Sequence, residues 1–117
     1  MTEIGKIMLL FVIVDSEKND AVIGLLKKMN CTGIMSIHGK GTARSEMLTT
    51  LGIGESDKFV IMCAINAENE EKVLARLSRR LQLDNPGSGI AFTVDINSVG
   101  GLKALTYLRG LHASGGI

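Results

Sequence analysis

Two uninterrupted apolar runs limit the folds open to this chain more than any other feature of the sequence. Residues 7–14 and residues 59–65 contain no charged side chain and are rich in branched aliphatic residues, a composition typical of β-strands. Neither run alternates apolar with polar residues, so each strand is expected to be buried on both faces. The sequence therefore predicts two strands in the interior of a sheet.

Two other segments have apolar residues at helical spacing. In the first, apolar positions recur with helical periodicity from Val22 to Met29, which predicts a helix of about a dozen residues. In the second, Asn66 is expected to cap the helix. Acidic residues occupy its first turn and arginines its last turns, an order that complements the helix macrodipole. Its apolar stripe consists of Val73, Leu74, Leu77 and Leu81.

Shorter strands are expected at residues 34–38 and 90–96, which gives the order β-α-β-β-α-β. This order predicts a single ferredoxin-like α+β domain over residues 1–117, with a four-stranded antiparallel sheet and two helices. The glycine-rich residues 39–54 form a long loop between the second and third strands. Loops longer than about 12–15 residues in a compact domain are usually functional or disordered. Residues 98–117 follow as a C-terminal segment.

Two helices can cover only one face of such a sheet. Strands that are apolar on both faces need a second cover, because an antiparallel sheet with one wet face should alternate apolar and polar residues. We therefore expect a homo-oligomer, and a ring-like homotrimer would pack the sheet faces around one axis. The alternative is that the C-terminal segment folds back over the open face.

The loop at residues 84–89 joins the second helix to the last strand. Pro86 cannot continue a helix, and Gly87 and Gly89 allow positive φ on either side of Ser88. Successive N–H groups in such a turn form a concavity that binds anions, which makes this loop a candidate phosphate site. A tight helix-to-strand turn explains the same residues without a ligand.

Composition and spacing argue against several other functions. Aromatic residues make up 3% of the chain and the net charge is +1, which argues against a nucleic-acid surface. Cys31 and Cys63 form no CxxC motif and are expected to be free thiols in a reducing compartment. His38 and His112 have no partner at metal-ligand spacing. No nucleophile–base pair is visible either, so we predict neither a metal centre nor an enzyme.

The sequence carries no visible targeting or membrane signal. The apolar run at residues 7–14 is too short to span a bilayer. It also lacks the small-residue cleavage site of a secretory signal peptide. We therefore expect a cytoplasmic protein that does not insert into a membrane.

Three stretches of the sequence resemble the PII signal-transduction (nitrogen regulatory) protein family. Residues 31–35, CTGIM, resemble the family's turn into its second strand, and residues 39–41, GKG, resemble the start of its T-loop. Residues 87–95, GSGIAFTVD, resemble its B-loop and fourth strand. The resemblance covers residues 5–103 and is greatest to short PII-like members with a Pro-Gly-x-Gly B-loop.

The resemblance implies a homotrimer that binds an adenine nucleotide, ATP or ADP, in each cleft between subunits, with Mg²⁺ as an optional companion. It also implies that the loop at residues 39–54 changes conformation with the nucleotide and regulates a target protein, such as a membrane transporter or an enzyme. Carried over by position, Thr32 lies near the adenine, and the B-loop amides face the phosphates. The implied nucleotide-binding residues are Gly87, Ser88, Gly89, Ile90, Thr32, Gly39, Lys40, Gly41 and Lys103. The implied partner-binding residues are Thr42, Arg44, Glu46 and Leu48.

The sequence departs from the family at positions that bind phosphate. Ile90 stands where the family has a lysine, and Gly101 stands where it has its first C-terminal arginine. Each lost charge-assisted contact removes about 1.5–3 kcal/mol. Lys40, Arg44 and Lys58 are candidates to replace that charge. The alternative function is therefore a PII-like trimer that has lost ATP binding and senses another small anion or a metal, or serves as a scaffold.

Overall fold

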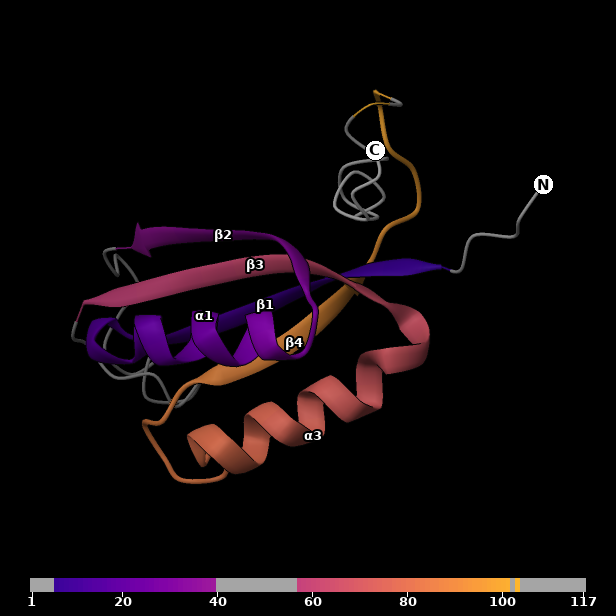
Figure 1. The fold of residues 1–117 in the computed structure, drawn as a ribbon. Helices are drawn as coiled ribbons and strands as arrows, with labels where there is room; N and C mark the ends of the chain where they lie inside the picture. The colour runs from indigo at the N-terminus through magenta and orange to yellow at the C-terminus, as the bar shows by residue number, and fades with distance from the viewer. Residues whose placement is uncertain (1–5, 40–56, 102, 104–117) are drawn as a thin grey trace.

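The computed structural model describes residues 6–39, 57–101 and 103. Within them, four strands form one antiparallel sheet in the order β2-β3-β1-β4, and two helices lie against one of its faces (Figure 1). The strands are β1, Ile7–Asp15, β2, Thr32–Gly39, β3, Lys58–Asn66, and β4, Ile90–Asp95. This arrangement confirms the ferredoxin-like α+β fold expected from the sequence.

The two uninterrupted apolar runs form the two central strands, as predicted. β1 pairs with β3 along its whole length, and β4 pairs with the other edge of β1. β2 pairs with the free edge of β3, with a register irregularity between Thr32 and Met35. Their central position accounts for the absence of charged side chains within the two runs.

Each helix begins with a short 3₁₀ turn that the periodicity did not reveal. The turn η1, Ser16–Lys18, leads into α1, Asn19–Lys28, and the turn η2, Ala67–Asn69, leads into α3, Glu70–Leu81. The expectation that Asn66 caps the second helix is wrong, because η2 separates it from α3 and its side chain makes no capping hydrogen bond. In the described part of the chain, no helix has the length and apolarity needed to cross a membrane.

One face of the sheet and the two helices enclose the core. Leu10, Val12 and Val14 of β1 are fully buried there, together with Ile61 of β3 and Leu26 of α1. The core members of α3 are Val73, Leu77 and Leu81, with Leu74 partly buried beside them. The helix-covered face is therefore completed within one chain.

The opposite face of the sheet is also apolar. Met35, Ile37, Phe92 and Val94 are 54%, 47%, 39% and 43% exposed on it. The rings of Phe11 and Phe92 stack across β1 and β4 with their centroids 5.2 Å apart. The sequence predicted this second apolar face, and most of the C-terminal segment that was its alternative cover lies outside the described residues.

Candidate functional site

The predicted site residues lie at two opposite ends of the sheet. Thr32 is the first residue of β2 and Gly39 is the last, so the two lie about 23 Å apart at the usual rise of a strand. The loop between α3 and β4, which holds Gly87 and Gly89, lies at the Gly39 end, because Gly89 packs against Ile13 near the end of β1 (Figure 1). One chain therefore cannot bring Thr32 and the glycine loop together.

The glycine loop closely approaches β1. Gly87 has a φ of +83° and Gly89 has a φ of +128°, conformations that side-chain-bearing residues rarely adopt. A Cβ at Gly89 would lie 2.6 Å from the carbonyl oxygen of Ile13 and 2.9 Å from Cγ1 of Val14. The loop therefore requires glycine at position 89 for its packing as well as for its backbone conformation.

The same loop uses some of its amides internally. Gln82, which ends α3 with a φ of +53°, accepts a hydrogen bond at 3.0 Å from the Asn85 N–H. The N–H of Ser88 donates to the carbonyl oxygen of Asn85 at 3.2 Å. These are the contacts of a tight helix-to-strand turn. An anion bound here would have to compete with Asn85 for the Ser88 amide.

A partly buried ion pair lies at the same end of the sheet. Lys58 is 6% exposed, and its Nζ contacts Oδ1 of Asp15. This pairing argues against the expectation that Lys58 replaces the charge missing at Ile90, because the ammonium group is already held by a carboxylate. Ile90 itself is half-buried at the start of β4, opposite Ile13.

At the other end of the sheet, Thr32 lines a small cavity of about 70 Å³. Its walls include Ala64, the register partner of Thr32, and Ile7 from β1. Ligand pockets usually measure about 300–1,000 Å³, so this cavity can hold only part of a ligand. Sequence analysis missed Ile7 and Ala64, because each is an ordinary strand residue until the register places it near Thr32.

Cys31 lines the same cavity and hydrogen-bonds with Cys63, and no disulfide joins the two. The hydrogen bond from the Cys63 thiol lowers the pKa of Cys31, an effect that burial opposes. The same hydrogen bond and burial raise the pKa of Cys63. The thiol of Cys31 therefore has the lower pKa of the two, and Cys63 is the buried core residue expected from the sequence.

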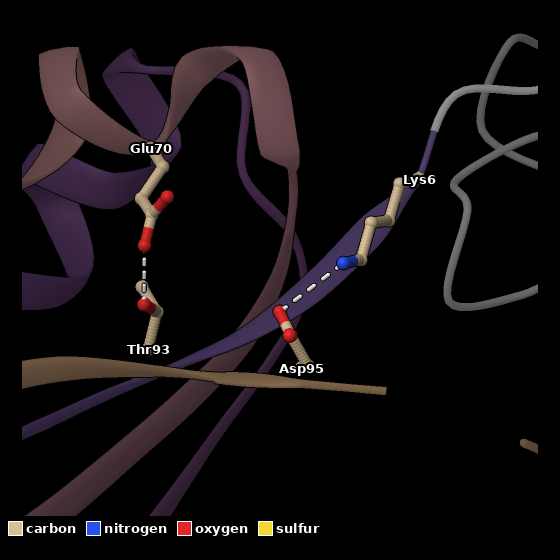
Figure 2. Close-up of polar contacts among 4 residues, drawn as sticks. All are labelled: Lys6, Glu70, Thr93 and Asp95. Atoms are coloured by element: carbon tan, nitrogen blue, oxygen red, sulfur yellow. Dashed lines mark hydrogen bonds and ion pairs between the residues drawn. The ribbon is translucent and has the colours of Figure 1, made fainter. Parts of the chain in front are cut away.

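Two polar contacts hold β4 in place (Figure 2). The hydroxyl of Thr93 donates a hydrogen bond to Oε2 of Glu70 at 2.6 Å, which ties the strand to the start of α3. Nζ of Lys6 lies 3.5 Å from Oδ1 of Asp95, and both side chains are more than half exposed. An exposed ion pair contributes little to stability, so the contact between Thr93 and Glu70 is the more important of the two.

The remaining predicted residues divide into two groups. Lys103 is described and exposed. Outside the described residues lie Lys40, Gly41, Thr42, Arg44, Glu46 and Leu48.

His38 has its Nε2 3.8 Å from Oδ2 of the exposed Asp57 and its ring beside Phe59. Across residues 6–39, 57–101 and 103, no cluster of three His, Cys, Asp or Glu side chains is placed to hold a metal ion.

The fold is that of a ferredoxin-like domain, and within one chain its candidate residues are divided between the two ends of the sheet. A family model for the nitrogen regulatory protein P-II matches residues 7–104. The chain therefore belongs to the P-II family, whose members are regulatory proteins. Comparison with curated protein sequences gave no match.

Solved structures share the fold at low sequence identity. The protein CPII from Thiomonas intermedia K12, bound to ADP, AMP and acetate, superposes with a TM-score of 0.63 at 20% identity, over 86% of this chain and 94% of CPII. A functionally unknown protein from Pediococcus pentosaceus ATCC 25745 has a TM-score of 0.60 at 12% identity, over 83% of this chain and 98% of that one. A Bacillus cereus protein related to NIF3 has a TM-score of 0.60 at 15% identity, over 86% of this chain and 27% of that one.

Proposed function

We propose that this protein is a PII-type regulator that assembles as a homotrimer and binds an adenine nucleotide in the clefts between subunits. In this proposal the bound nucleotide sets the conformation of residues 39–54, and this loop docks onto a target transporter or enzyme in the cytoplasm. The protein catalyses no reaction. Because partner and nucleotide act on the same loop equilibrium, each must bind its two states with different affinity.

The observation that carries the proposal is the separation of the candidate residues. Thr32 and the loop of Gly87 and Gly89 lie at opposite ends of the sheet. A ligand that contacts both must therefore lie between two chains, with Thr32 from one and the glycine loop from its neighbour. The small cavity at Thr32 supports this division, because it can receive only one end of a ligand.

The uncovered sheet face supports the assembly. Phe92 and Val94 on one outer strand and Met35 and Ile37 on the other leave apolar side chains exposed at both margins of this face. Exposed apolar patches of this kind mark interaction sites. Packing this face against other copies would bury it and would bring the two half-sites of neighbouring chains together.

Membership of the P-II family and one solved relative support an adenine nucleotide as the ligand. CPII was solved with ADP and AMP bound. The apolar walls that Ile7 and Ala64 give the Thr32 cavity suit a purine base. Backbone amides of the glycine loop and the exposed Lys103 would then face the phosphates, and Mg²⁺ would bind together with the nucleotide.

A second candidate function is favoured by residues of the proposed site that are poorly suited to bind phosphate. Ile90 supplies no charge, Lys58 is already paired with Asp15, and the Ser88 amide is engaged with Asn85. A trimer that has lost ATP binding, and that senses another small anion or a metal or serves as a scaffold, would show these same features.

Isothermal titration calorimetry against ATP, ADP and AMP, with and without Mg²⁺, separates the two functions. The regulator proposal expects one nucleotide bound per chain. Gly87→Ala should weaken that binding about tenfold, because a loop that relaxes to relieve the strain must regain positive φ to bind, at a cost of about 1–2 kcal/mol. A Cβ at Gly87 meets no atom within 4 Å, so the change adds no clash.

Gly24→Ala in α1 is the matched control, because a Cβ there also meets nothing within 4 Å. It should leave nucleotide affinity unchanged. No heat with any nucleotide, from a protein that light scattering shows to be trimeric, would reject nucleotide binding and favour the second function. A monomer that binds no nucleotide would reject both.

A further inference from the structure

The outer side of α3 gathers positive charge. Lys72, Arg76, Arg79 and Arg80 are exposed and recur at helical spacing, and Lys28 at the end of α1 adjoins them. These five residues are termed the cationic surface. α3 lies at the margin of the helical layer, so its outer side faces away from the sheet (Figure 1).

Two adjoining hollows follow the cationic surface and share Lys72 and Arg76. The first hollow is completed by Arg79 and Arg80. The second extends to Lys28 and to three asparagines, Asn30, Asn66 and Asn69. Among the described residues, no aspartate or glutamate lines either hollow. The pair of hollows therefore offers positive charge and amide groups without a competing carboxylate.

Within the described residues, no ion pair neutralises this charge. The ion pairs in the described ranges are Lys58–Asp15, Lys6–Asp95 and His38–Asp57, and none of them involves the cationic surface. The helix macrodipole favours Arg79 and Arg80 in the last turn of α3. It disfavours Lys72, which lies in the first turn of α3. The macrodipole therefore explains the arginines in the last turn of α3, as the sequence suggested, but not Lys72.

We propose that the cationic surface binds an acidic peptide segment of a partner protein. Lys72 and Arg80 are about 12 Å apart along the helix axis at the usual rise, which matches about four residues of extended chain. Arg76, Arg79 and Arg80 can each bind a carboxylate through two parallel hydrogen bonds. The surface contains none of residues 39–54, so it would add a second contact with the target.

The asparagines favour a peptide over a nucleic acid. The side-chain amides of Asn30, Asn66 and Asn69 each offer a donor and an acceptor, which is what a peptide backbone requires of its partner. No aromatic ring lines either hollow within the described residues, whereas single-stranded nucleic acids are usually bound by stacking on such rings.

Fluorescence anisotropy with a fluorescein-labelled hexaglutamate peptide, at about 50 mM salt to limit screening, tests the proposal. The full-length wild-type protein should bind this peptide. The double variant Arg76→Gln/Arg79→Gln should bind it at least about tenfold more weakly, as expected for the loss of charge-assisted hydrogen bonds. Lys72→Gln alone should weaken binding about threefold or more.

The matched control is Lys18→Gln/Lys27→Gln, which removes the same charge from helical positions that line neither hollow. It should change the affinity less than about twofold, because screened charges at a distance contribute little. Lys27, Lys72, Arg76 and Arg79 are exposed and Lys18 is partly buried, so circular dichroism is used to check that each variant is folded.

Three results would overturn the proposal. The first is equal loss of affinity in the two double variants, since the peptide would then respond to net charge alone. The second is no binding of hexaglutamate by the wild type up to about 1 mM, the weakest affinity of interest. The third is tighter binding of a labelled oligothymidylate that is lost in the arginine variant, which would assign the surface to nucleic acid.

Discussion

The two faces of the sheet are made from the same strands, yet within the described residues only one of them is covered by helices. Leu9 and Leu10 are neighbours in β1 and point to opposite faces. Leu10 is fully buried beneath the helices, whereas Leu9 on the open face is only half-buried. The comparison teaches that the composition of a strand tells how much of its surface must be buried, but not which chain buries it.

The open face is organised as well as apolar. The strand register places Met35, Met62, Phe11 and Phe92 in one row across all four strands. Phe11 and Phe92 in this row already stack on each other. An ordered apolar row that reaches both edges of the sheet is suited to packing against further copies. Disturbing each face in turn should therefore have different consequences.

The largest expected effect is a cavity in the covered face. Leu10→Ala should lower the free energy of unfolding by about 2–5 kcal/mol, as large-to-small changes at fully buried leucines do. Urea unfolding followed by circular dichroism, at one fixed protein concentration, measures it. Leu9→Ala removes the same atoms from the open face. It should lower the free energy of unfolding clearly less than Leu10→Ala when both are measured on the monomeric chain. Equal costs would show that the two faces do not differ.

The next effect concerns assembly. Phe92→Lys places a charge on the open face and removes apolar burial worth about 1.5–3 kcal/mol per chain. The variant should elute as a folded monomer in size-exclusion chromatography coupled to light scattering. Ala21→Lys, at an exposed position of α1, should leave the assembly intact. A Phe92 variant with the mass of the wild type would contradict burial of this face between copies.

A smaller effect is expected at the rim of the covered face. Thr93→Val keeps the shape of the side chain but removes the hydrogen bond to Glu70. The loss should be about 0.5–1.5 kcal/mol, because Glu70 is only partly buried. The urea midpoint reports it. Thr93→Ser retains the hydroxyl group and should recover most of the loss. An unchanged midpoint in the valine variant would show that the contact is not stabilising.

The smallest effect is chemical. Cys63→Ala removes the hydrogen bond that lowers the pKa of Cys31 and leaves burial, which raises it. The thiolate of Cys31 should therefore form at higher pH in the variant than in the wild type. The rate of iodoacetamide labelling at Cys31, measured across pH by mass spectrometry, should shift in that direction. Superimposable profiles would show that Cys63 does not tune the thiol.

The fold could be predicted from the sequence more completely than the candidate site. The apolar runs indicated the central strands, because only interior strands can lack charge over such a length. The role of Asn66 was mistaken, since periodicity cannot distinguish a 3₁₀ turn from the first turn of an α-helix. The separation of Thr32 from the glycine loop was also hidden, because assignment by position does not say which chain supplies each residue.

The cationic surface shows a different limit. Arg76, Arg79 and Arg80 were visible as a cluster, and the helix macrodipole gave them a sufficient explanation within α3. The proximity of Arg76 to Lys28 depends on where the fold places the end of α1 relative to α3. That relation is a property of the folded chain, and no local pattern in either helix contains it.

The residues that flank the long connection between β2 and β3 have a further consequence. Gly39 and Lys58 are register partners, so the connection starts and ends within about 5 Å, the spacing of neighbouring strands. Doubling the length of a flexible loop costs only about 0.6 kcal/mol. Mutation and selection can therefore lengthen, shorten or rewrite this segment at little expense to the folded frame. Descendants of this chain could carry a different connecting segment while inheriting the same sheet.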